Sequence, residues 1–378
     1  MIYRDFQGMQ LSGLGLGMMR LPVVNGDDAK IDEAAVEAMI AEAIKSGINY
    51  FDTAWGYHDG NSELAAGNAL SKYPRESYYL ADKFPGYDNT NMPKVKEIFE
   101  EQLKKCRTPY FDFYLFHNVY EGNIDDYLNP KFGILDYLLE QKKNGRIRHL
   151  GFSCHGGIDV LKRFLEAYGE HMEFCQLQLN YMDWHFQKCE EKLALCKKRG
   201  LPVWVMEPLR GGRLCSLPDS MADALKAMRP SESIPAWAFR FLQTLDVTMV
   251  LSGMSDMAQL QENIQTWSED KPLTREEFDR LVALMDEEAK KGGLPCTACH
   301  YCTGHCPKQL PIPELISFYN EHLSTRGGMS FLAPMGVASM PEEQRPASCI
   351  GCRSCEQVCP QQIKISEMMK DFSGMIGM

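Results

Sequence analysis

The chain lacks the features that mark membrane-spanning, secreted or nucleic-acid-binding proteins. No run of 18 apolar residues occurs, so the sequence predicts no membrane-spanning helix. The start, MIYRDFQGMQ, places charges where a signal peptide needs an apolar stretch, so we expect a cytoplasmic protein. Basic residues are few, with Lys+Arg 40 against Asp+Glu 51 and a net charge of −11, which argues against binding to nucleic acid.

Cysteine is distributed unevenly along the 378 residues. Six of the 14 cysteines are scattered through the first part of the chain: Cys106, Cys154, Cys175, Cys189, Cys196 and Cys215. The other eight fall between Cys296 and Cys359, a density that indicates metal binding in a chain without a signal peptide. Charge changes at the same place, because residues 291–378 carry 7 Lys+Arg and 7 Asp+Glu. We therefore expect two domains, residues 1–290 and 291–378.

The first domain repeats a short apolar run followed by an amphipathic helix. The predicted strands are Leu14–Gly17, Ile48–Phe51, Tyr78–Ala81, Phe113–Phe116, Ile147–Phe152, Phe174–Leu179, Val203–Met206 and Val247–Leu251. The predicted helices are Ile31–Lys45, Ser62–Ser71, Pro93–Lys105, Ile134–Lys143, Val160–Tyr168, Cys189–Lys198, Ile234–Leu245, Met257–Thr266 and Arg275–Lys290. Eight such units imply parallel strands with crossover helices and suit a closed (β/α)8 barrel. A hairpin is expected before them, at Ile2–Phe6 and Met9–Leu11.

The alternative fold is an open, doubly wound sheet, which favours G-x-G-x-x-G at its first turn. Here Gly13, Gly15 and Gly17 form G-x-G-x-G, and Arg20 stands where the third Gly of the motif would be. Because this match is incomplete, the sequence favours the barrel.

Polar residues recur at the ends of the predicted strands, where barrel enzymes place their chemistry. They are Asp52, Lys83, His117, Ser153, Gln178, Glu207 and Ser252. One such residue is more often a turn or capping group than a catalytic group. Seven of them at the same point of seven units are hard to attribute to capping alone, so we expect an active site.

Four residues at these strand ends suggest a proton-donating site. Lys83 and Asp52 would form a buried ion pair, and a tyrosine near Lys83 should have its pKa lowered from about 10. Tyr57 lies five residues after Asp52 and could then act as a general acid. His117, at the next strand end, could orient a carbonyl oxygen. What the set lacks is a reductant, which points to a bound hydride carrier.

The segments FDTAWGY, ADK and LFH resemble the active-site segments of the aldo-keto reductase superfamily. The resemblance covers residues 1–290. It implies that Tyr57 is the acid, that Lys83 and Asp52 tune it, and that His117 orients the carbonyl group.

The resemblance also implies a nicotinamide cofactor lying across the barrel mouth. Ser153 and Gln178 would hold its carboxamide and Tyr181 would stack on the ring, whereas Leu209, Arg210 and Gly212 would cover the pyrophosphate. The adenosine-binding residues would be Gln259, Glu262 and Asn263. Relatives that prefer NADPH often place a basic side chain there, but residues 251–267 hold no Lys or Arg and do hold Asp256. The choice between NADP and NAD therefore stays open.

The second domain carries two runs with the spacing of [4Fe–4S] ligands in bacterial ferredoxins. The runs are Cys296-x2-Cys299-x2-Cys302-x3-Cys306-Pro307 and Cys349-x2-Cys352-x2-Cys355-x3-Cys359-Pro360. We therefore expect an α+β ferredoxin-like domain. In such runs the fourth cysteine ligates the other cluster, so Cys296, Cys299, Cys302 and Cys359 would hold one cluster. Cys349, Cys352, Cys355 and Cys306 would hold the second. Zinc is the alternative, since C-x2-C pairs also bind Zn²⁺.

Between the two runs we expect a helix at Pro313–His322 and a loop at Ser324–Glu343, which is rich in Gly, Pro and Met.

These observations predict an oxidoreductase that reduces or oxidises a small carbonyl or alcohol substrate. The ferredoxin-like domain would pass single electrons. Because a hydride carries two electrons, three arrangements stay open: structural clusters, a bound flavin, or an external redox partner. Trp55, Tyr120, His155 and Trp184 are candidates for the substrate pocket. The alternative is an electron-transfer or partner-binding module whose barrel does not catalyse.

Overall fold

The computed structural model describes residues 1–289, 293–324 and 332–377. Eight parallel strands close into a barrel in the order β10-β3-β4-β5-β6-β7-β8-β9, so the predicted (β/α)8 barrel is confirmed. Its strands are β3 (Leu14–Gly17), β4 (Tyr50–Asp52), β5 (Tyr79–Phe84), β6 (Phe111–Val119), β7 (Ile147–Cys154), β8 (Phe174–Gln178), β9 (Val203–Met206) and β10 (Met249–Gly253).

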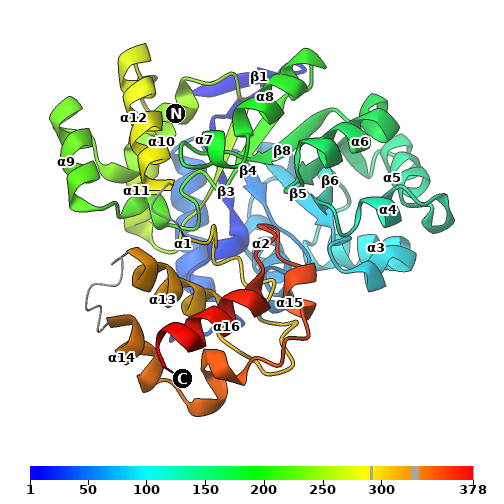
Figure 1. The fold of residues 1–378 in the computed structure, drawn as a ribbon. Coiled ribbons are helices and arrows are strands. Elements are labelled where there is room, and N and C mark those ends of the chain that lie inside the picture. The colour runs from blue at the N-terminus through cyan, green and yellow to red at the C-terminus, as the bar shows by residue number, and fades with distance from the viewer. Residues whose placement is uncertain (290–292, 325–331, 378) are drawn as a thin grey trace.

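One long helix follows each strand and packs outside the barrel (Figure 1). These helices are α1 (Glu33–Lys45), α2 (Ser62–Leu70), α3 (Val95–Lys105), α5 (Ile134–Lys143), α6 (Ile158–Tyr168), α8 (Cys189–Lys198), α10 (Ile234–Gln243) and α11 (Met257–Thr266). Four additional helices are α4 (Ile124–Tyr127), α7 (Asp183–Phe186), α9 (Asp219–Met228) and α12 (Arg275–Ala289). Of these four, the sequence predicted α12.

Local chemistry sets the helix ends. The Asp32 carboxylate accepts a hydrogen bond from the Ala35 amide (3.0 Å) and so caps the first turn of α1. The chain leaves α1 at Gly47, whose φ of +91° lies in the left-handed region that glycine adopts without strain.

A hairpin fills the N-terminal end of the barrel. Its strands, β1 (Tyr3–Phe6) and β2 (Met9–Ser12), pair antiparallel. Phe6 and Leu11 join the buried core inside the barrel, where the Phe6 ring lies 4.9 Å from the Trp204 ring. Because side chains fill this end, any large cavity of the barrel must open at the C-terminal ends of the strands.

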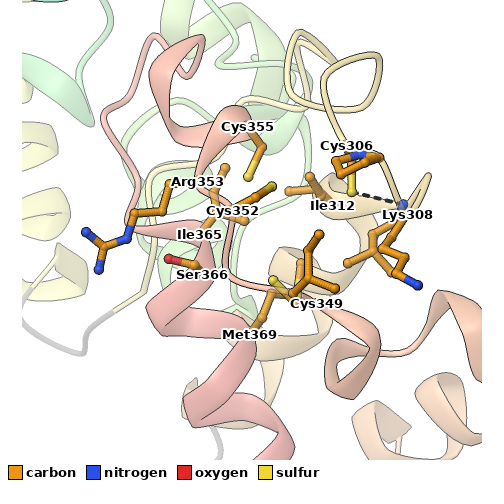
Figure 2. A pocket seen from close by; sticks show the side chains of 13 residues that line it. Cys306, Lys308, Ile312, Cys349, Cys352, Arg353, Cys355, Ile365, Ser366 and Met369 are labelled. Atoms are coloured by element: carbon orange, nitrogen blue, oxygen red, sulfur yellow. Dashed lines mark hydrogen bonds between the residues drawn. The ribbon is translucent and has the colours of Figure 1, made fainter.

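The part of the chain after the barrel folds into helices and loops around its own core (Figures 1 and 2). Its helices are α13 (Ile312–Ser324), α14 (Leu332–Ser339), α15 (Ser354–Gln357) and α16 (Ile365–Met375). Residues 293–324 and 332–377 contain no strand, where we expected an α+β arrangement. The loops that carry the cysteines turn too often for strand pairing. The predicted loop at 324–343 contains α14, and the predicted domain boundary falls on residues 290–292, outside the described residues.

This second domain covers the C-terminal mouth of the barrel. The Arg20 guanidinium, just after β3, donates hydrogen bonds to the carbonyl oxygens of Thr297 (2.9 Å) and Ala298 (3.2 Å). On the other side of the mouth, the Gln361 amide donates to Gln178 Oε1 at the end of β8 (2.7 Å). The mouth is therefore enclosed by two domains.

None of the helices within the described ranges has the length and apolar character needed to cross a bilayer.

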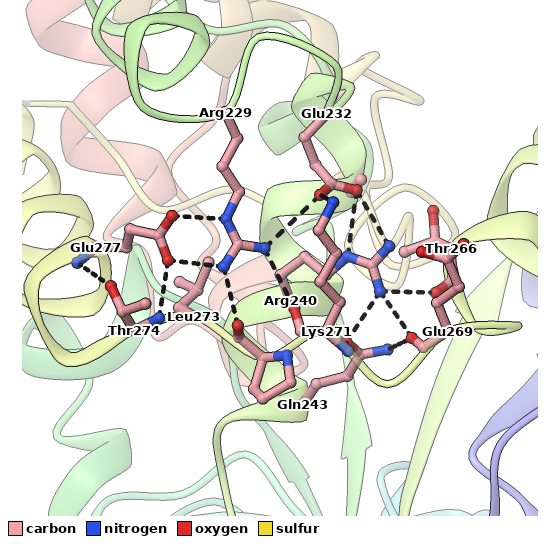
Figure 3. Close-up of polar contacts among 12 residues, drawn as sticks. Arg229, Glu232, Arg240, Gln243, Thr266, Glu269, Lys271, Leu273, Thr274 and Glu277 are labelled. Carbon is pink, nitrogen blue, oxygen red and sulfur yellow. Dashed lines mark hydrogen bonds and ion pairs between the residues drawn. The ribbon is translucent and has the colours of Figure 1, made fainter.

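A buried arginine ties the last helices of the barrel together (Figure 3). The Arg240 guanidinium on α10 donates to the carbonyl oxygens of Thr266 (2.9 Å) and Glu269 (2.8 Å), and to Gln243 Oε1 (3.0 Å). It also pairs with the Glu232 carboxylate at 3.1 Å. The network therefore connects the residues before α10 with the end of α11 and the segment that follows it.

Replacing Arg240 by alanine should therefore destabilise the barrel. Arg240→Ala removes the donor to the buried Thr266 carbonyl oxygen and one of the cations that pair with Glu232, which keeps Lys271 (3.0 Å). We expect this loss to lower the free energy of unfolding by about 2 kcal/mol. The measurement is the guanidinium midpoint for loss of far-ultraviolet circular dichroism. Arg275→Ala is the control, because its pair with Asp279 is exposed and should contribute less than about 1 kcal/mol. Equal shifts for the two variants would contradict this interpretation.

Candidate active site at the barrel mouth

A fully buried ion pair lies at the base of the mouth. Lys83 on β5 is 0% exposed, and its Nζ donates to Asp52 Oδ1 (2.7 Å) and to the Thr53 carbonyl oxygen (2.6 Å). Asp52, the last residue of β4, is 3% exposed. Among the described residues its Oδ2 has no hydrogen-bond partner. The pair thus places one cation and one anion in a region from which water is excluded.

Tyr57 lies against this pair, in a short turn after β4. The Lys83 ammonium is 4.9 Å from the centre of the Tyr57 ring. We expected this cation to lower the pKa of Tyr57, and the expectation is wrong: burial raises the pKa to about 12. The charge of Lys83 acts in the predicted direction, but the loss of solvent around the phenolate is the larger effect.

His117, near the end of β6, completes the group. Its ring centre lies 5.9 Å from that of Tyr57. Burial, with a contribution from the charge of Lys83, lowers the pKa of His117 well below its usual value, so the imidazole is neutral at neutral pH. The predicted tetrad of Asp52, Tyr57, Lys83 and His117 therefore occupies one place in the fold.

A cavity of about 480 Å³ opens above this group. Eight of the residues predicted for catalysis or nucleotide binding line it: Asp52, Tyr57, His117, Leu209, Gly212, Gln259, Glu262 and Asn263. Glu207, Ser252 and His155 also line it. The strand-end pattern thus led to a real cavity, with Lys83 lying beneath its wall.

Four residues predicted to bind the nucleotide do not line the cavity. Ser153 Oγ accepts a hydrogen bond from the backbone N–H of Asn118 (2.7 Å) on the neighbouring strand. The Gln178 side chain contacts Asp183 (2.8 Å) and Gln361. Both predicted carboxamide ligands are thus engaged within the protein.

Tyr181 and Arg210 are also directed elsewhere. The Tyr181 ring is buried against Phe241 at 6.1 Å, outside the cavity. The Arg210 guanidinium pairs with Asp183 (3.1 Å) and contacts the Pro295 carbonyl oxygen (3.4 Å). Arg210 therefore connects the barrel to the second domain.

Two residues that the sequence analysis missed line the cavity in their place. Gln176 lies two residues before Gln178 on β8, and its buried Oε1 has no partner among the described residues. Met206, the last residue of β9, contributes to the same wall. Alternation along β8 places Phe174, Gln176 and Gln178 on one face. This alternation puts both glutamines on the same face of β8, but it does not give the depth at which the cavity lies.

Side chains occupy backbone donors at the start of α11, where the resemblance implied adenosine binding. The Asp256 carboxylate accepts a hydrogen bond from the backbone N–H of Gln259 (2.9 Å). Gln259 Oε1 in turn accepts one from the backbone N–H of Ser255 (2.9 Å), so each side chain satisfies a backbone donor. Arg20 is the one Lys or Arg among the described lining residues, and its guanidinium is bonded to the second domain. The cavity lining near α11 therefore carries one acidic residue, Glu262, together with Arg20.

Of the four aromatic pocket candidates, His155 alone lines the cavity within the described chain. Trp55 packs under the Lys105 ammonium (4.1 Å), and Trp184 packs against Phe241. The Tyr120 hydroxyl donates to the Gln357 carbonyl oxygen at the domain interface. These rings serve packing and docking.

The eight cysteines of the second domain surround two hollows. Cys306, Cys349, Cys352 and Cys355 line the first of them (Figure 2). Cys296, Cys299, Cys302 and Cys359 line the other. Each hollow thus takes three cysteines from one run and the fourth from the other run, as the crossed assignment requires.

The hollows suit a group larger than one ion. Among the described residues, no three His, Cys, Asp or Glu side chains converge closely enough to hold a single metal ion. Backbone amides point at two of the sulfurs, from Ala298 to Cys296 (3.4 Å) and from Leu310 to Cys306 (3.5 Å). Such hydrogen bonds are typical of iron–sulfur sites.

The high pKa of Tyr57 has a measurable consequence. Because its folded pKa of about 12 lies above that of the unfolded chain, the protonated phenol stabilises the fold below about pH 10, and this contribution is lost as pH rises through 12. The ultraviolet titration of the native protein minus that of Tyr57→Phe should show no phenolate at pH 10. A half-formed phenolate at pH 10 in that difference would contradict the assignment.

Comparison with known proteins agrees with this geometry. The profile of the aldo/keto reductase family matches residues 13–286, and that of the 4Fe-4S dicluster domain matches residues 295–364. The "NADH-specific methylglyoxal reductase" of Escherichia coli (strain K12) is 30% identical over 224 residues, which cover 54% of this chain and 65% of that protein. The "Uncharacterized oxidoreductase YqkF" of Bacillus subtilis (strain 168) is 26% identical over 314 residues, or 75% of this chain and 95% of that protein.

Solved structures give the same result. The holo form of aldo-keto reductase AKR11C1 from Bacillus halodurans superposes with a TM-score of 0.61 at 25% identity and covers 75% of this chain and 95% of that one. A Klebsiella pneumoniae aldo-keto reductase in complex with NADPH superposes with a TM-score of 0.59 at 18% identity, covering 75% and 96% of the two chains, and so shares the fold. The chain belongs to the aldo/keto reductase family, and its barrel is followed by a 4Fe-4S dicluster domain.

Proposed function

We propose that this oxidoreductase reduces small carbonyl compounds, or oxidises the corresponding alcohols, with Tyr57 as the proton-transfer group. One observation carries the proposal. The buried Lys83–Asp52 pair lies directly against Tyr57, and Asp52, Tyr57 and His117 line one cavity. Burying such a pair beside a phenol is costly, and the arrangement is suited to the transfer of a proton.

In this proposal each side chain has one task in carbonyl reduction. A nicotinamide bound in the cavity would supply the hydride that the carbonyl carbon receives. The Tyr57 hydroxyl gives its proton to the carbonyl oxygen, and neutral His117 donates a hydrogen bond to that oxygen. Lys83 stabilises the tyrosinate that is left, and Asp52 balances the charge of Lys83. Hydride and proton together convert the carbonyl group to an alcohol.

The cavity suits a nicotinamide. Gln176 Oε1 is a buried acceptor without a partner in the described part of the chain, and Gln176 lines the same cavity as His117. A carboxamide N–H would satisfy it. Glu262 lines the cavity and Asp256 starts α11, and both would repel a 2′-phosphate. We therefore favour NADH over NADPH, and the name of the Escherichia coli relative states NADH specificity for that enzyme.

For the second domain we propose two [4Fe–4S] clusters, one in each cysteine-lined hollow. Thiolate ligation requires reduced cysteines, which favours a reducing compartment such as the cytoplasm. A cluster exchanges one electron and a hydride carries two. Three arrangements satisfy this count: clusters that are structural, a flavin in the barrel that exchanges one or two electrons, or an external redox protein that feeds a one-electron reaction.

We favour a role in electron transfer, because the two hollows lie between the barrel cavity and solvent. Cys299, of the hollow lined by Cys296, also lines the barrel cavity. In the other hollow Cys352 is exposed, and Ile350 beside it is 60% exposed. The alternative function, a partner-binding module with a non-catalytic barrel, gives no reason for the buried Lys83–Asp52 pair.

Tyr57→Phe tests the catalytic proposal. The variant keeps the ring but removes the transferable proton, so kcat for aldehyde reduction with NADH should fall by a factor of about 10² to 10⁴. Steady-state kinetics on a set of small aldehydes gives the value. Tyr79→Phe is the matched control, since Tyr79 begins β5 at the opposite end of the barrel and should leave kcat unchanged. An undiminished kcat in Tyr57→Phe would contradict the proposal.

Paired cysteine variants test the crossed ligation. If Cys299 and Cys359 bind the same cluster, the double variant Cys299→Ser/Cys359→Ser keeps the other cluster and about 4 iron atoms per chain, whereas Cys299→Ser/Cys306→Ser loses both. Ligation within each run predicts the reverse. Iron analysis and the visible spectrum of anaerobically purified protein give the result. Zinc in place of iron in the native protein would refute the cluster proposal outright.

A further inference from the structure

The second domain builds part of the barrel cavity. Cys299 and Tyr301 line it together with Tyr57 and His117, although nearly 200 residues of chain separate the two pairs. Both belong to residues 296–302, which we call the cluster-binding loop because it carries three cysteines of one hollow. The carbonyl site is therefore composed of two domains.

Tyr301 contacts the candidate catalytic histidine directly. Its hydroxyl lies 3.3 Å from His117 Nε2, and their ring centres are 6.3 Å apart. Among the described residues, His117 Nδ1 has no partner, so Tyr301 is the hydrogen-bond contact found for this imidazole. In a neutral imidazole one nitrogen donates and the other accepts. The contact with Tyr301 therefore restrains the orientation of the imidazole ring.

A second tyrosine holds Tyr301 in place. The Tyr87 ring stacks on Tyr301 at 5.1 Å with an interplanar angle of 24°. It also meets His117 edge-on at 5.1 Å. His117 and Tyr301 thus line the cavity with Tyr57, and Tyr87 packs against both of their rings.

The cluster-binding loop is fixed on the rim of the barrel. Arg20 donates to Thr297 and Ala298, as described above, and Thr297 is buried. A Cβ added at Gly211 would lie 2.1 Å from the Thr297 carbonyl oxygen, so glycine permits this close approach. Tyr301 is consequently a fixed wall residue of the cavity.

We propose that Tyr301 is a positioning and specificity-determining residue of the carbonyl site, and the proposal rests on the function proposed above. Its hydroxyl orients His117 toward the carbonyl oxygen. Its ring closes the cavity on the side of the second domain and so restricts the enzyme to compact carbonyl compounds. The cluster-binding loop thereby determines which substrates the barrel accepts.

Two substitutions separate the two tasks in the full-length protein with its iron. Tyr301→Phe keeps the ring, so size selectivity should remain, but without the hydroxyl kcat for propanal should fall about 3- to 10-fold with little change in KM. Tyr301→Ala opens the wall. The ratio of kcat/KM for 2-naphthaldehyde to that for propanal should then rise at least about 10-fold.

The control is Tyr120→Phe, which removes a hydrogen bond at the same domain interface but lies outside the cavity. It should change neither kcat nor the selectivity ratio. Two further readouts are the iron content and the affinity for NADH by fluorescence titration, and neither should change in the Tyr301 variants.

The outcomes are distinguishable. An unchanged selectivity ratio in Tyr301→Ala with native iron content overturns the proposal. If Tyr301→Ala loses iron, Tyr301→Phe decides, and an unchanged kcat in that variant overturns the proposal. Retained activity in Tyr57→Phe instead overturns the underlying function, whatever the Tyr301 variants do.

Discussion

The ion pair between Lys83 and Asp52 is the constraint on which the rest of the site depends. Removing two charges from water costs several kcal/mol per ion, and close geometry must offset that cost. The 2.7 Å contact and the additional Thr53 carbonyl acceptor provide this geometry. The same cation depresses the pKa of His117 and opposes the effect of burial on Tyr57. Loss of either partner would leave an uncompensated charge beneath the cavity, so the two residues act as one unit.

Burial is also the reason why sequence analysis located this site better than it described it. The strand-end pattern brought Asp52, Lys83 and His117 together, because parallel strands of a barrel end on the same side. It could not give the depth of a residue below the mouth. Gln178 was chosen although Gln176 lines the cavity, and the pKa of Tyr57 was expected to fall although desolvation raises it. A strand pattern predicts which residues lie near one another, but it does not predict how far each side chain is removed from solvent.

The docking of the second domain was the larger gap in the prediction. Regular cysteine spacing predicted which four cysteines share a hollow, since the geometry of the cluster is built into that spacing. No pattern indicated that the domain would cover the barrel mouth. The contacts that hold it there, such as Arg20 with Thr297 and Gln361 with Gln178, are single hydrogen bonds between segments remote in the sequence. Tyr301 was consequently passed over as a residue between two ligands.

The backbone of the cluster-binding loop indicates how iron and the carbonyl site are linked. Ala298 and His300, on either side of Cys299, have φ values of +50° and +62°. Residues with a Cβ are disfavoured in this region by roughly 1–2 kcal/mol each, so the loop needs an interaction that holds it. A cluster ligated by Cys299 would provide this interaction, because small domains commonly rely on metals for stability. Together with the Arg20 contacts, such a ligand would hold Tyr301, the next residue but one after Cys299, against His117. The iron site would then shape the carbonyl site through the backbone, whether or not electrons pass between them.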